Sequence, residues 1–395
     1  MKDSIYSLAL RYIGRVLRTM QYGEPLPNLP TGLDWRGVYH VSKEHSLAGT
    51  LWYFISDLVK TDCSESDAEL IERWECECSI AFAQNLVQTA EFVHLTDALT
   101  KAEIKFLPLK GFIFKKLWRK SEYRTMTDMD IYFGNDQMDR VSEKLLALGY
   151  RFDHGSMIHD AFVKPPYLKI EAHKLLRGDS NDGFECWQAK VDNPYWYEMS
   201  DVDLMLFNVA HIYKHYINGG CGARSLFDLQ LFIEQKPDIV NNPLLLERLS
   251  QENMLDFYHD MLHLMHFWYG DGTGKEYASD TNLLIDGAPT DKLCEMEYYV
   301  ATGGAYGLES NKVEYNLVKQ GRVRYYLSRM FLPYKSMCET YPWLRRAPIL
   351  LPAAYVIRWF RSISNGRLKN ELRLIKRADK KLADKTSDTP EATNK

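Results

Sequence analysis

The sequence predicts an α+β fold: a small mixed β-sheet with helices, flanked by N- and C-terminal helical regions. Apolar residues recur at helical spacing before residue 102 and again after about residue 200. Between these regions, short apolar runs alternate with helix-like segments, which is the order expected of a mixed sheet. We therefore divide the chain into an N-terminal helical region, an α/β domain, a helical domain and a basic amphipathic region with a disordered tail: 1–102, 103–178, 179–330 and 331–395.

In the first region, apolar side chains repeat at helical spacing in three segments, 4–20, 43–60 and 67–102. The Pro- and Gly-rich stretch "GEPLPNLPTGLDW" separates the first segment from the second. The sequence therefore predicts three helices ahead of the sheet.

The middle of the chain alternates between extended and helical patterns. The predicted strands are "IKFLPL" (104–109), "TDMDIYF" (127–133), "HDAFVK" (159–164) and "YLKIEAHKLL" (167–176), and the predicted helices are "FIFKKLW" (112–118) and "NDQMDRVSEKLLALGY" (135–150). Helical patterns then return at 201–217, 224–235, 243–253 and 255–270. These last four segments predict a helical bundle after the sheet.

Composition excludes several classes of protein. The chain has 395 residues, 46% of them apolar, and a net charge of −4, so its overall charge does not favour nucleic acid. Its seven cysteines show no paired spacings, as expected in a reducing cytoplasm. The N-terminal stretch is interrupted by charges, unlike a signal peptide, and no apolar run reaches the ~20 residues that span a bilayer. We expect a soluble, cytoplasmic protein.

Three carboxylates fall on the polar faces of two predicted strands. Side chains alternate across a strand, so Asp128 and Asp130 share the face opposite Met129 and Ile131. Glu171 occupies the polar face of the later strand. Like charges at this spacing repel, unless water covers them or a cation holds them together. Either the strand face is simply solvated, or the strands are neighbours and the three carboxylates converge on Mg²⁺.

The sequence "LKG" at 109–111 lies between a predicted strand and a predicted helix. Glycine at such a turn lets a phosphate approach the backbone, and a helix N-terminus favours negative charge. Lys110 would add a positive charge for a triphosphate. The alternative is a plain tight turn with an exposed lysine.

Taken together, these residues resemble the DNA polymerase β-like nucleotidyltransferase superfamily. The match lies in a strand ending in Gly, a helix, two acidic residues on the next strand and a third on a later strand. The stretches "LPLKG", "YRTMTDMDIYF", "LLALGY", "IEAH" and "HIYKHYINGGCGARSLFDLQLF" are similar to the bacterial "uncharacterised nucleotidyltransferase" family, over residues 104 to about 235.

The resemblance implies Mg²⁺-dependent transfer of a nucleoside monophosphate from an NTP to a hydroxyl-bearing acceptor, with release of pyrophosphate. Asp128 and Asp130 would be ligands of two Mg²⁺ ions, with Mn²⁺ as a substitute, and Glu171 the third ligand. The acceptor can be a small molecule, a protein or RNA.

One turn departs from the superfamily pattern. Gly111 is followed by Phe112 instead of Gly or Ser, so a hydroxyl contact to the phosphates is missing. Lys110 and Arg124 are our candidate replacements. This departure keeps a second hypothesis open, in which the chain is a catalytically silent binding or regulatory module that keeps the nucleotidyltransferase fold.

Four further residues are candidate nucleotide contacts. Lys169 and His173 share the strand face of Glu171. Arg224 and Asp228 are spaced i, i+4 on one predicted helix, which predicts an ion pair. The resemblance implies that this pair faces the active cleft.

Two sets of histidines raise the alternative of a zinc site. His211 and His215 have i, i+4 spacing, but Ile212 stands where the metalloprotease motif has Glu. His259, His263 and His266 raise the same alternative. We favour helix-face histidines near the sheet domain over zinc ligands.

The C-terminal segment 345–381 is basic and contains an aromatic, apolar stretch. Such a segment can pack on the bundle with its basic face in water, lie on an anionic membrane surface, or hold a polyanionic partner. We expect the first of these, and a disordered polar end after it.

Overall fold

The computed structural model describes residues 4–176, 184–270, 284–285, 288–365, 369–370 and 372–378. The chain divides into two units: the first comprises 1–213 and 221–305, and the second 214–220 and 306–395. The end of the predicted α/β domain (177–178) and the tail after 378 lie outside the described residues. The four-region division therefore stays a prediction.

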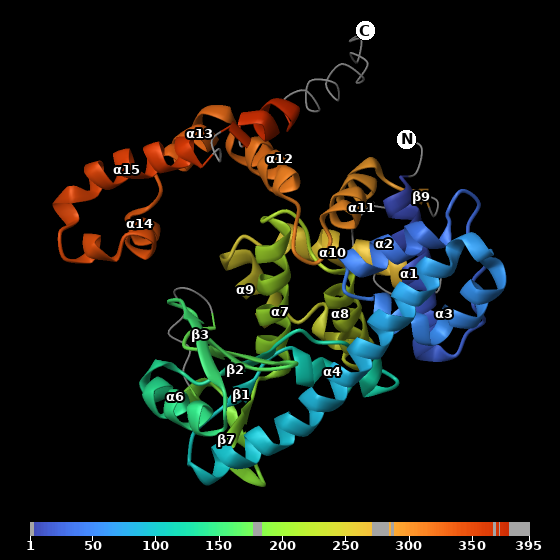
Figure 1. Cartoon of the computed structure of the whole chain (residues 1–395), viewed down its shortest axis with the longest axis horizontal. Helices are drawn as coiled ribbons and strands as arrows, with labels where there is room; N and C mark the ends of the chain where they lie inside the picture. Colours follow the sequence, from blue (N-terminus) through green and yellow to red (C-terminus); the bar gives the residue numbers. More distant parts are fainter. Residues whose placement is uncertain are drawn as a thin grey trace. The chain divides into compact units, whose positions relative to one another are not determined.

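The first unit combines helices with a five-stranded mixed sheet, as the sequence predicted (Figure 1). Its helices are α1 (Ile5–Tyr22), α2 (Trp35–Glu44), α3 (Ala48–Asp62), α4 (Ala68–Lys101), α5 (Gly111–Lys115), α6 (Met138–Ala147), α7 (Asp201–Tyr216, whose last residues belong to the second unit), α8 (Ala223–Gln235), α9 (Pro243–Gln251), α10 (Leu255–Tyr269) and α11 (Asp291–Gly303). The α2 helix was not predicted, because it starts at the end of the Pro- and Gly-rich stretch. Asp34 begins it by accepting a hydrogen bond from the backbone N–H of Gly37.

The sheet has the strand order β1-β2-β5-β4-β3. Its strands are β1 (Leu107–Pro108), β2 (Met129–Tyr132), β3 (Arg151–Gly155), β4 (His159–Lys164) and β5 (Leu168–His173), and a separate hairpin holds β6 (Gln188–Lys190) and β7 (Asn193–Glu198). β2 and β5 run parallel, whereas β5 and β4 are antiparallel partners joined by a short loop. The sequence missed β3, β6 and β7.

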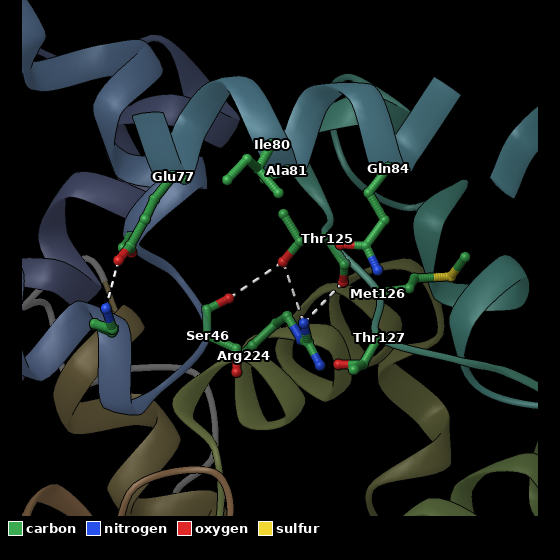
Figure 2. Close-up of a pocket in the computed structure, with 12 residues that line it drawn as sticks. Ser46, Glu77, Ile80, Ala81, Gln84, Thr125, Met126, Thr127 and Arg224 are labelled. Atoms are coloured by element: carbon green, nitrogen blue, oxygen red, sulfur yellow. Dashed lines mark hydrogen bonds and ion pairs between the residues drawn. The ribbon is translucent and has the colours of Figure 1, made fainter. Parts of the chain in front are cut away.

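The N-terminal helices contact the loop that leads into β2. The hydroxyl of Thr125 donates to the carbonyl oxygen of Ser46 across 3.2 Å (Figure 2). The hydroxyl of Thr50 donates to the carbonyl of Tyr123 at 2.7 Å in the same loop. The helical region before the sheet therefore helps fix the segment that ends at Asp128.

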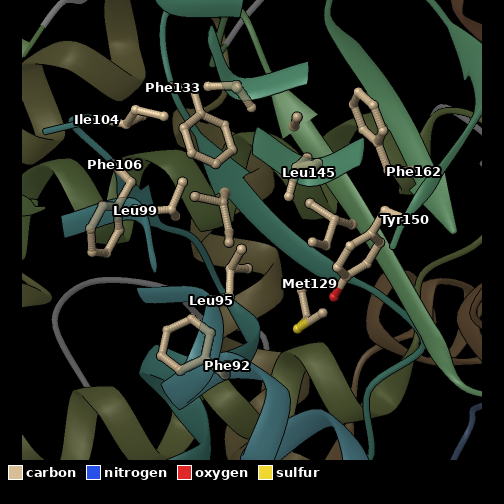
Figure 3. Close-up of a cluster of buried hydrophobic side chains, with 14 of the residues drawn as sticks. Phe92, Leu95, Leu99, Ile104, Phe106, Met129, Phe133, Leu145, Tyr150 and Phe162 are labelled. Carbon is tan, nitrogen blue, oxygen red and sulfur yellow. The ribbon is translucent and has the colours of Figure 1, made fainter. Parts of the chain in front are cut away.

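The main core lies on one face of the sheet (Figure 3). The strands contribute Met129, Ile131, Phe133, Ile170 and Ala172, and the helices α4 and α6 cover them with Phe92, Leu95, Leu99, Met138, Val141 and Leu145. Burial of this apolar face fixes the strand register, because a slip of one residue would expose it. The same alternation directs the acidic side chains of β2 and β5 to the opposite face.

The acidic face is partly covered as well. Tyr132 packs in a smaller cluster with Leu107, Phe184, Trp187 and Phe207, the last of these from α7. The carboxylates before Tyr132 therefore lie in a half-buried setting instead of on an open, solvated strand face.

The second unit is helical, with α12 (Glu309–Gln320), α13 (Arg322–Met330), α14 (Tyr334–Thr340) and α15 (Leu351–Ser364). Ala354 of α15 is buried in a cluster with Met337 and Cys338 of α14, within the same unit. The packing of 345–381 on the helical bundle stays a prediction. Ile357 and Phe360 on α15 are 49% and 69% exposed. Among the described residues, no helix is long and apolar enough to cross a membrane.

A buried histidine makes the stability of the first unit depend on pH. His45 is fully buried; its Nδ1 accepts a hydrogen bond from the N–H of Ala223 at 3.1 Å. Burial lowers the pKa of His45 from 6.5 to about 4. In the unfolded chain His45 is therefore protonated below about pH 6.5, whereas in the folded chain it stays neutral down to about pH 4. Stability from this residue is present above pH 6.5 and is lost as the pH falls through that window.

We expect the free energy of unfolding to fall by about 3 kcal/mol from this residue between pH 7 and pH 4. Urea unfolding at a series of pH values measures the loss. His45→Asn keeps a hydrogen-bond acceptor near the position of Nδ1 but does not titrate, so the difference between the two proteins isolates His45. Parallel pH profiles of wild type and His45→Asn would contradict the prediction.

Candidate active site

The two predicted acidic strands are direct neighbours. In the parallel β2–β5 ladder, Asp130 lies opposite Glu171, and both point away from the main core. Asp128 immediately precedes β2, two residues before Asp130, and therefore lies on the same side of the chain. The structure thus places the three predicted carboxylates next to one another on one face of the sheet.

Two lysines supply positive charge to this group. The ammonium of Lys110 lies 3.3 Å from Oδ2 of Asp130. Lys169 reaches two carboxylates, with its Nζ 2.7 Å from Oε1 of Glu171 and 3.8 Å from Oδ2 of Asp128. Both lysines were candidate nucleotide contacts, and the structure brings both to the carboxylates.

Two histidines complete the polar face. Nε2 of His173 lies 3.0 Å from Oδ1 of Asp130 and 3.9 Å from Oε2 of Glu171. His159, which was not among the predicted site residues, has its Nε2 3.8 Å from the same Oε2. A signal for His159 existed: a hairpin with a three-residue loop at 165–167 places residue 159 opposite residue 173, as observed.

The environments of the carboxylates differ, so their pKa values diverge. Burial, reinforced by repulsion from Asp130 and Glu171, raises the pKa of Asp128 to about 6. Burial also opposes ionisation of Asp130, but Lys110 and His173 outweigh it and hold the pKa of Asp130 well below its usual range. Burial disfavours the charged form of Glu171 too, yet the hydrogen bond from Lys169 leaves the pKa of Glu171 lowered. Asp130 and Glu171 are therefore anionic at neutral pH. Their negative charges add to the effect of burial in opposing the ionisation of Asp128.

The predicted phosphate turn has an unusual backbone. Lys110 ends the segment after β1 with φ +31°, in a region that a residue with a side chain rarely adopts. Gly111 begins α5, and a Cβ there would lie 2.5 Å from the sulfur of Met126. The close approach at Gly111 is therefore to the loop before β2. Glycine allows this loop and the Lys110 turn to meet.

Arg124 and Asp228 form a buried ion pair with each other. Nε and Nη2 of Arg124 donate to the two carboxylate oxygens of Asp228 at 2.8 and 2.7 Å, and the indole of Trp118 donates to Oδ1 at 2.8 Å. The side chains of Arg124 and Asp228 are only 6% and 4% exposed. The prediction of an ion pair between Arg224 and Asp228 was wrong. The guanidinium that pairs with Asp228 belongs to Arg124, in the loop before β2.

Arg224 instead lines a cavity of about 220 Å³ next to that loop (Figure 2). Its Nη1 donates to the carbonyl oxygen of Thr125 at 2.8 Å and lies 3.2 Å from the Thr125 hydroxyl. Gln84 of α4 and Thr127 also line the cavity, so one wall ends one residue before Asp128. The cavity and the carboxylates thus share the segment that leads into β2.

A second cavity, of about 330 Å³, lies among α4, α5 and β7. Its lining includes Lys115, whose ammonium donates to Oδ1 of Asn85 at 3.1 Å and to Oγ1 of Thr89 at 3.2 Å. Burial, aided by the charge of Arg124, lowers the pKa of Lys115 to about 8. None of the three carboxylates lines this cavity.

The helix histidines do not form a metal centre of three ligands. Within the part of the chain that the structure describes, one group of at least three potential ligands has its donor atoms within 4.8 Å of one another: His159, Glu171 and His173. His211 nevertheless acts on the site, since its charge contributes to the low pKa of Asp130.

A five-stranded mixed sheet thus carries paired aspartates at one strand and a glutamate on its parallel neighbour, the arrangement that the resemblance to nucleotidyltransferases predicts. The family model "Uncharacterised nucleotidyltransferase" matches residues 31–270, more than half of the chain. The chain belongs to the uncharacterised nucleotidyltransferase family. No curated protein and no solved structure matches it.

Proposed function

We propose that this protein transfers a nucleoside monophosphate from an NTP to a hydroxyl-bearing acceptor and releases pyrophosphate. The observation that carries the proposal is the register of the β2–β5 ladder. It places Asp130 beside Glu171, and Asp128 lies two residues before Asp130 on the same strand face. Family membership supports nucleotidyl transfer in general.

Asp128, Asp130 and Glu171 would hold divalent cations, Mg²⁺ or Mn²⁺. Carboxylate oxygens are the ligands these ions prefer. Burial, and after it the charges of Asp130 and Glu171, raise the pKa of Asp128, and a bound cation would offset both effects. When bound, such ions activate the attacking hydroxyl and stabilise the leaving pyrophosphate. The donor set of this site therefore supports the metal requirement that we propose.

The basic residues receive separate roles. Lys110, at the turn before α5, would bind the phosphates in place of the missing hydroxyl. Lys169 and His173 would orient Glu171 and Asp130. Arg224 would contact a substrate in the cavity that ends beside Asp128. Arg124 and Asp228 would position the loop before β2, because their buried ion pair ties this loop to α8.

The competing hypothesis is a silent module that keeps the fold without catalysis. Phe112 in place of Gly or Ser favours it, whereas the three adjacent carboxylates favour an enzyme.

Residues 345–381 remain a proposed surface for an anionic membrane or a polyanion, with Ile357 and Phe360 exposed. Co-sedimentation of the full chain with anionic vesicles tests that surface, and its absence would remove the membrane proposal.

Calorimetric titration with each NTP and Mg²⁺ tests the proposed function. We expect wild type to bind at least one NTP in a Mg²⁺-dependent manner and Asp128→Ala/Asp130→Ala to lose this dependence. Incubation of wild type with labelled NTP and total cellular RNA, protein or small molecules then identifies the acceptor class.

The matched control is Asp139→Ala/Asp153→Ala, which removes the same charge from exposed positions of the same domain. It should bind NTP as wild type does. If wild type and Asp128→Ala/Asp130→Ala bind equally, or neither binds, the silent module replaces the enzyme.

A further inference from the structure

The polar face carries a second set of ligands that differs in chemistry from the aspartate pair. His159, Glu171 and His173 each offer one ligand atom, and these atoms all lie within 4.8 Å of one another. Both imidazole Nε2 atoms are close to one oxygen, Oε2 of Glu171, at 3.8 and 3.9 Å. Neighbouring ligands bound about 2.1 Å from one ion lie about 3.0 to 3.4 Å apart. Small side-chain movements therefore suffice to close the group around an ion.

Regular backbone holds these three residues in place. His159 and His173 are direct cross-strand partners in the antiparallel β4–β5 ladder, with ring centroids 5.3 Å apart. Glu171 is two residues from His173 on β5 and so shares its face. A site on two paired strands is positioned more rigidly than one on loops.

The two oxygens of Glu171 face different partners. Oε1 accepts from Lys169, whose ammonium also lies beside Asp128. Oε2 is the oxygen that approaches the two imidazoles. Glu171 thus has one oxygen on the side of Lys169 and Asp128 and the other in a set with two imidazole nitrogens.

These sets select different ions. Mg²⁺ prefers oxygen ligands and near-ideal octahedral geometry, whereas imidazole suits Zn²⁺ and its first-row neighbours. Two histidines with one carboxylate are typical of sites that keep positions open for water or substrate. Nε2 of His173 also lies 3.0 Å from Oδ1 of Asp130, so binding of an ion to this nitrogen would replace that contact.

We propose that His159, Glu171 and His173 form a transition-metal site, with Zn²⁺ as its preferred ion, beside the oxygen-ligand site of Asp128 and Asp130. The proposal rests on the proposed function only through Glu171, which both share, and it adds His159 and His173 as ligands. It assigns the two cation positions to different classes of metal.

Two measurements on the full chain test it. Calorimetric titration with Zn²⁺ alone is expected to show one tight site that excess Mg²⁺ does not displace. Pulsed electron paramagnetic resonance of the protein loaded with Cu²⁺, a paramagnetic ion that imidazole suits as it suits Zn²⁺, is expected to show coupling to imidazole nitrogen from both His159 and His173. The resonance spectrum needs no variant, so it stands even if a substitution disturbs folding.

His159→Gln should weaken Zn²⁺ binding by about tenfold or more and reduce the nitrogen coupling. The matched control is His154→Gln, which changes an exposed histidine on β3 whose ring centroid lies 6.1 Å from that of His159. It should bind Zn²⁺ as wild type does.

Wild type without nitrogen coupling, or equal Zn²⁺ affinity in wild type and His159→Gln, would overturn the proposal. Failure of the proposed function gives a different result: no Mg²⁺-dependent NTP binding, with the Zn²⁺ site intact. Asp128→Asn separates the two as well, because it should impair NTP binding and leave the nitrogen coupling in place.

Discussion

Asp130→Asn is expected to lower the rate of nucleotidyl transfer by about three orders of magnitude or more, equivalent to about 4 kcal/mol of transition-state stabilisation. Asp130 is the central carboxylate, since it contacts Lys110 and His173 and lies opposite Glu171. Asparagine keeps the shape of the side chain and one acceptor oxygen, so the fold is retained. It removes the negative charge that the low pKa of Asp130 guarantees at neutral pH.

Pyrophosphate release from the NTP that wild type binds, in the presence of its acceptor, measures the effect. The matched control is Asp160→Asn on β4, where a half-buried aspartate pairs with Lys174 at 2.7 Å and lies opposite Ala172, which faces the core. It removes the same charge from the same sheet and should leave the rate close to wild type. A rate above about a tenth of wild type in Asp130→Asn would show that this carboxylate is not at the reaction centre.

Local patterns were sufficient to predict the part of the site that depends on strand alternation. Met129 and Ile131 entered the core, which left Asp128 and Asp130 on the other face. The predicted helices at 201–217, 224–235, 243–253 and 255–270 match α7 to α10 within one or two residues. The neighbour relation between β2 and β5, which the sequence left conditional, is confirmed.

Ion pairs between residues far apart in the sequence could not be predicted from helical or strand periodicity. Asp228 has Arg224 one helical turn away, but its partner is Arg124, 104 residues earlier in the chain. The i, i+4 rule describes exposed pairs on one helix and does not decide between partners when the helix face is buried. His159 was missed for a different reason: it belongs to no motif of its own, and only the register of the β4–β5 hairpin places it opposite His173.

The role of Gly111 also needed the fold. The phosphate contact predicted for Gly111 stays a prediction, and the structure adds that the nearest obstacle to a side chain there is the sulfur of Met126. Met126 belongs to the loop before β2, so the turn at Lys110 packs against the segment that leads to Asp128 without the help of a ligand. Such contacts between separate loops carry no periodic signal in the sequence.

Arg124→Met is expected to lower the free energy of unfolding by about 3 to 5 kcal/mol. The substitution keeps much of the aliphatic volume but leaves Asp228 buried with the Trp118 indole as its remaining partner among the described residues. An uncompensated buried carboxylate is far more costly than the loss of an exposed pair. Urea unfolding, followed by tryptophan fluorescence and circular dichroism, measures the change.

Two variants show whether burial of the charge is the cause. Arg73→Met breaks an ion pair of similar length, 2.6 Å to Glu69, on an exposed helix surface, and should change stability by at most about 0.5 kcal/mol. Arg124→Met/Asp228→Leu removes both buried charges and should recover most of the stability that Arg124→Met loses. A loss below about 1 kcal/mol in Arg124→Met, or no recovery in the double variant, would contradict the assignment.

The double variant also separates positioning from stability. Arg124 lies four residues before Asp128, and its bidentate bond to α8 fixes the direction in which the loop enters β2. An apolar pair of similar volume can fill the space without this directional constraint. We therefore expect Arg124→Met/Asp228→Leu to fold with nearly wild-type stability and to bind NTP, but to transfer nucleotide about a hundredfold more slowly. A stable double variant with a wild-type rate would show that the ion pair serves the fold alone, and that Asp128 is positioned by the β2–β5 ladder and the contacts of Met126 with Gly111.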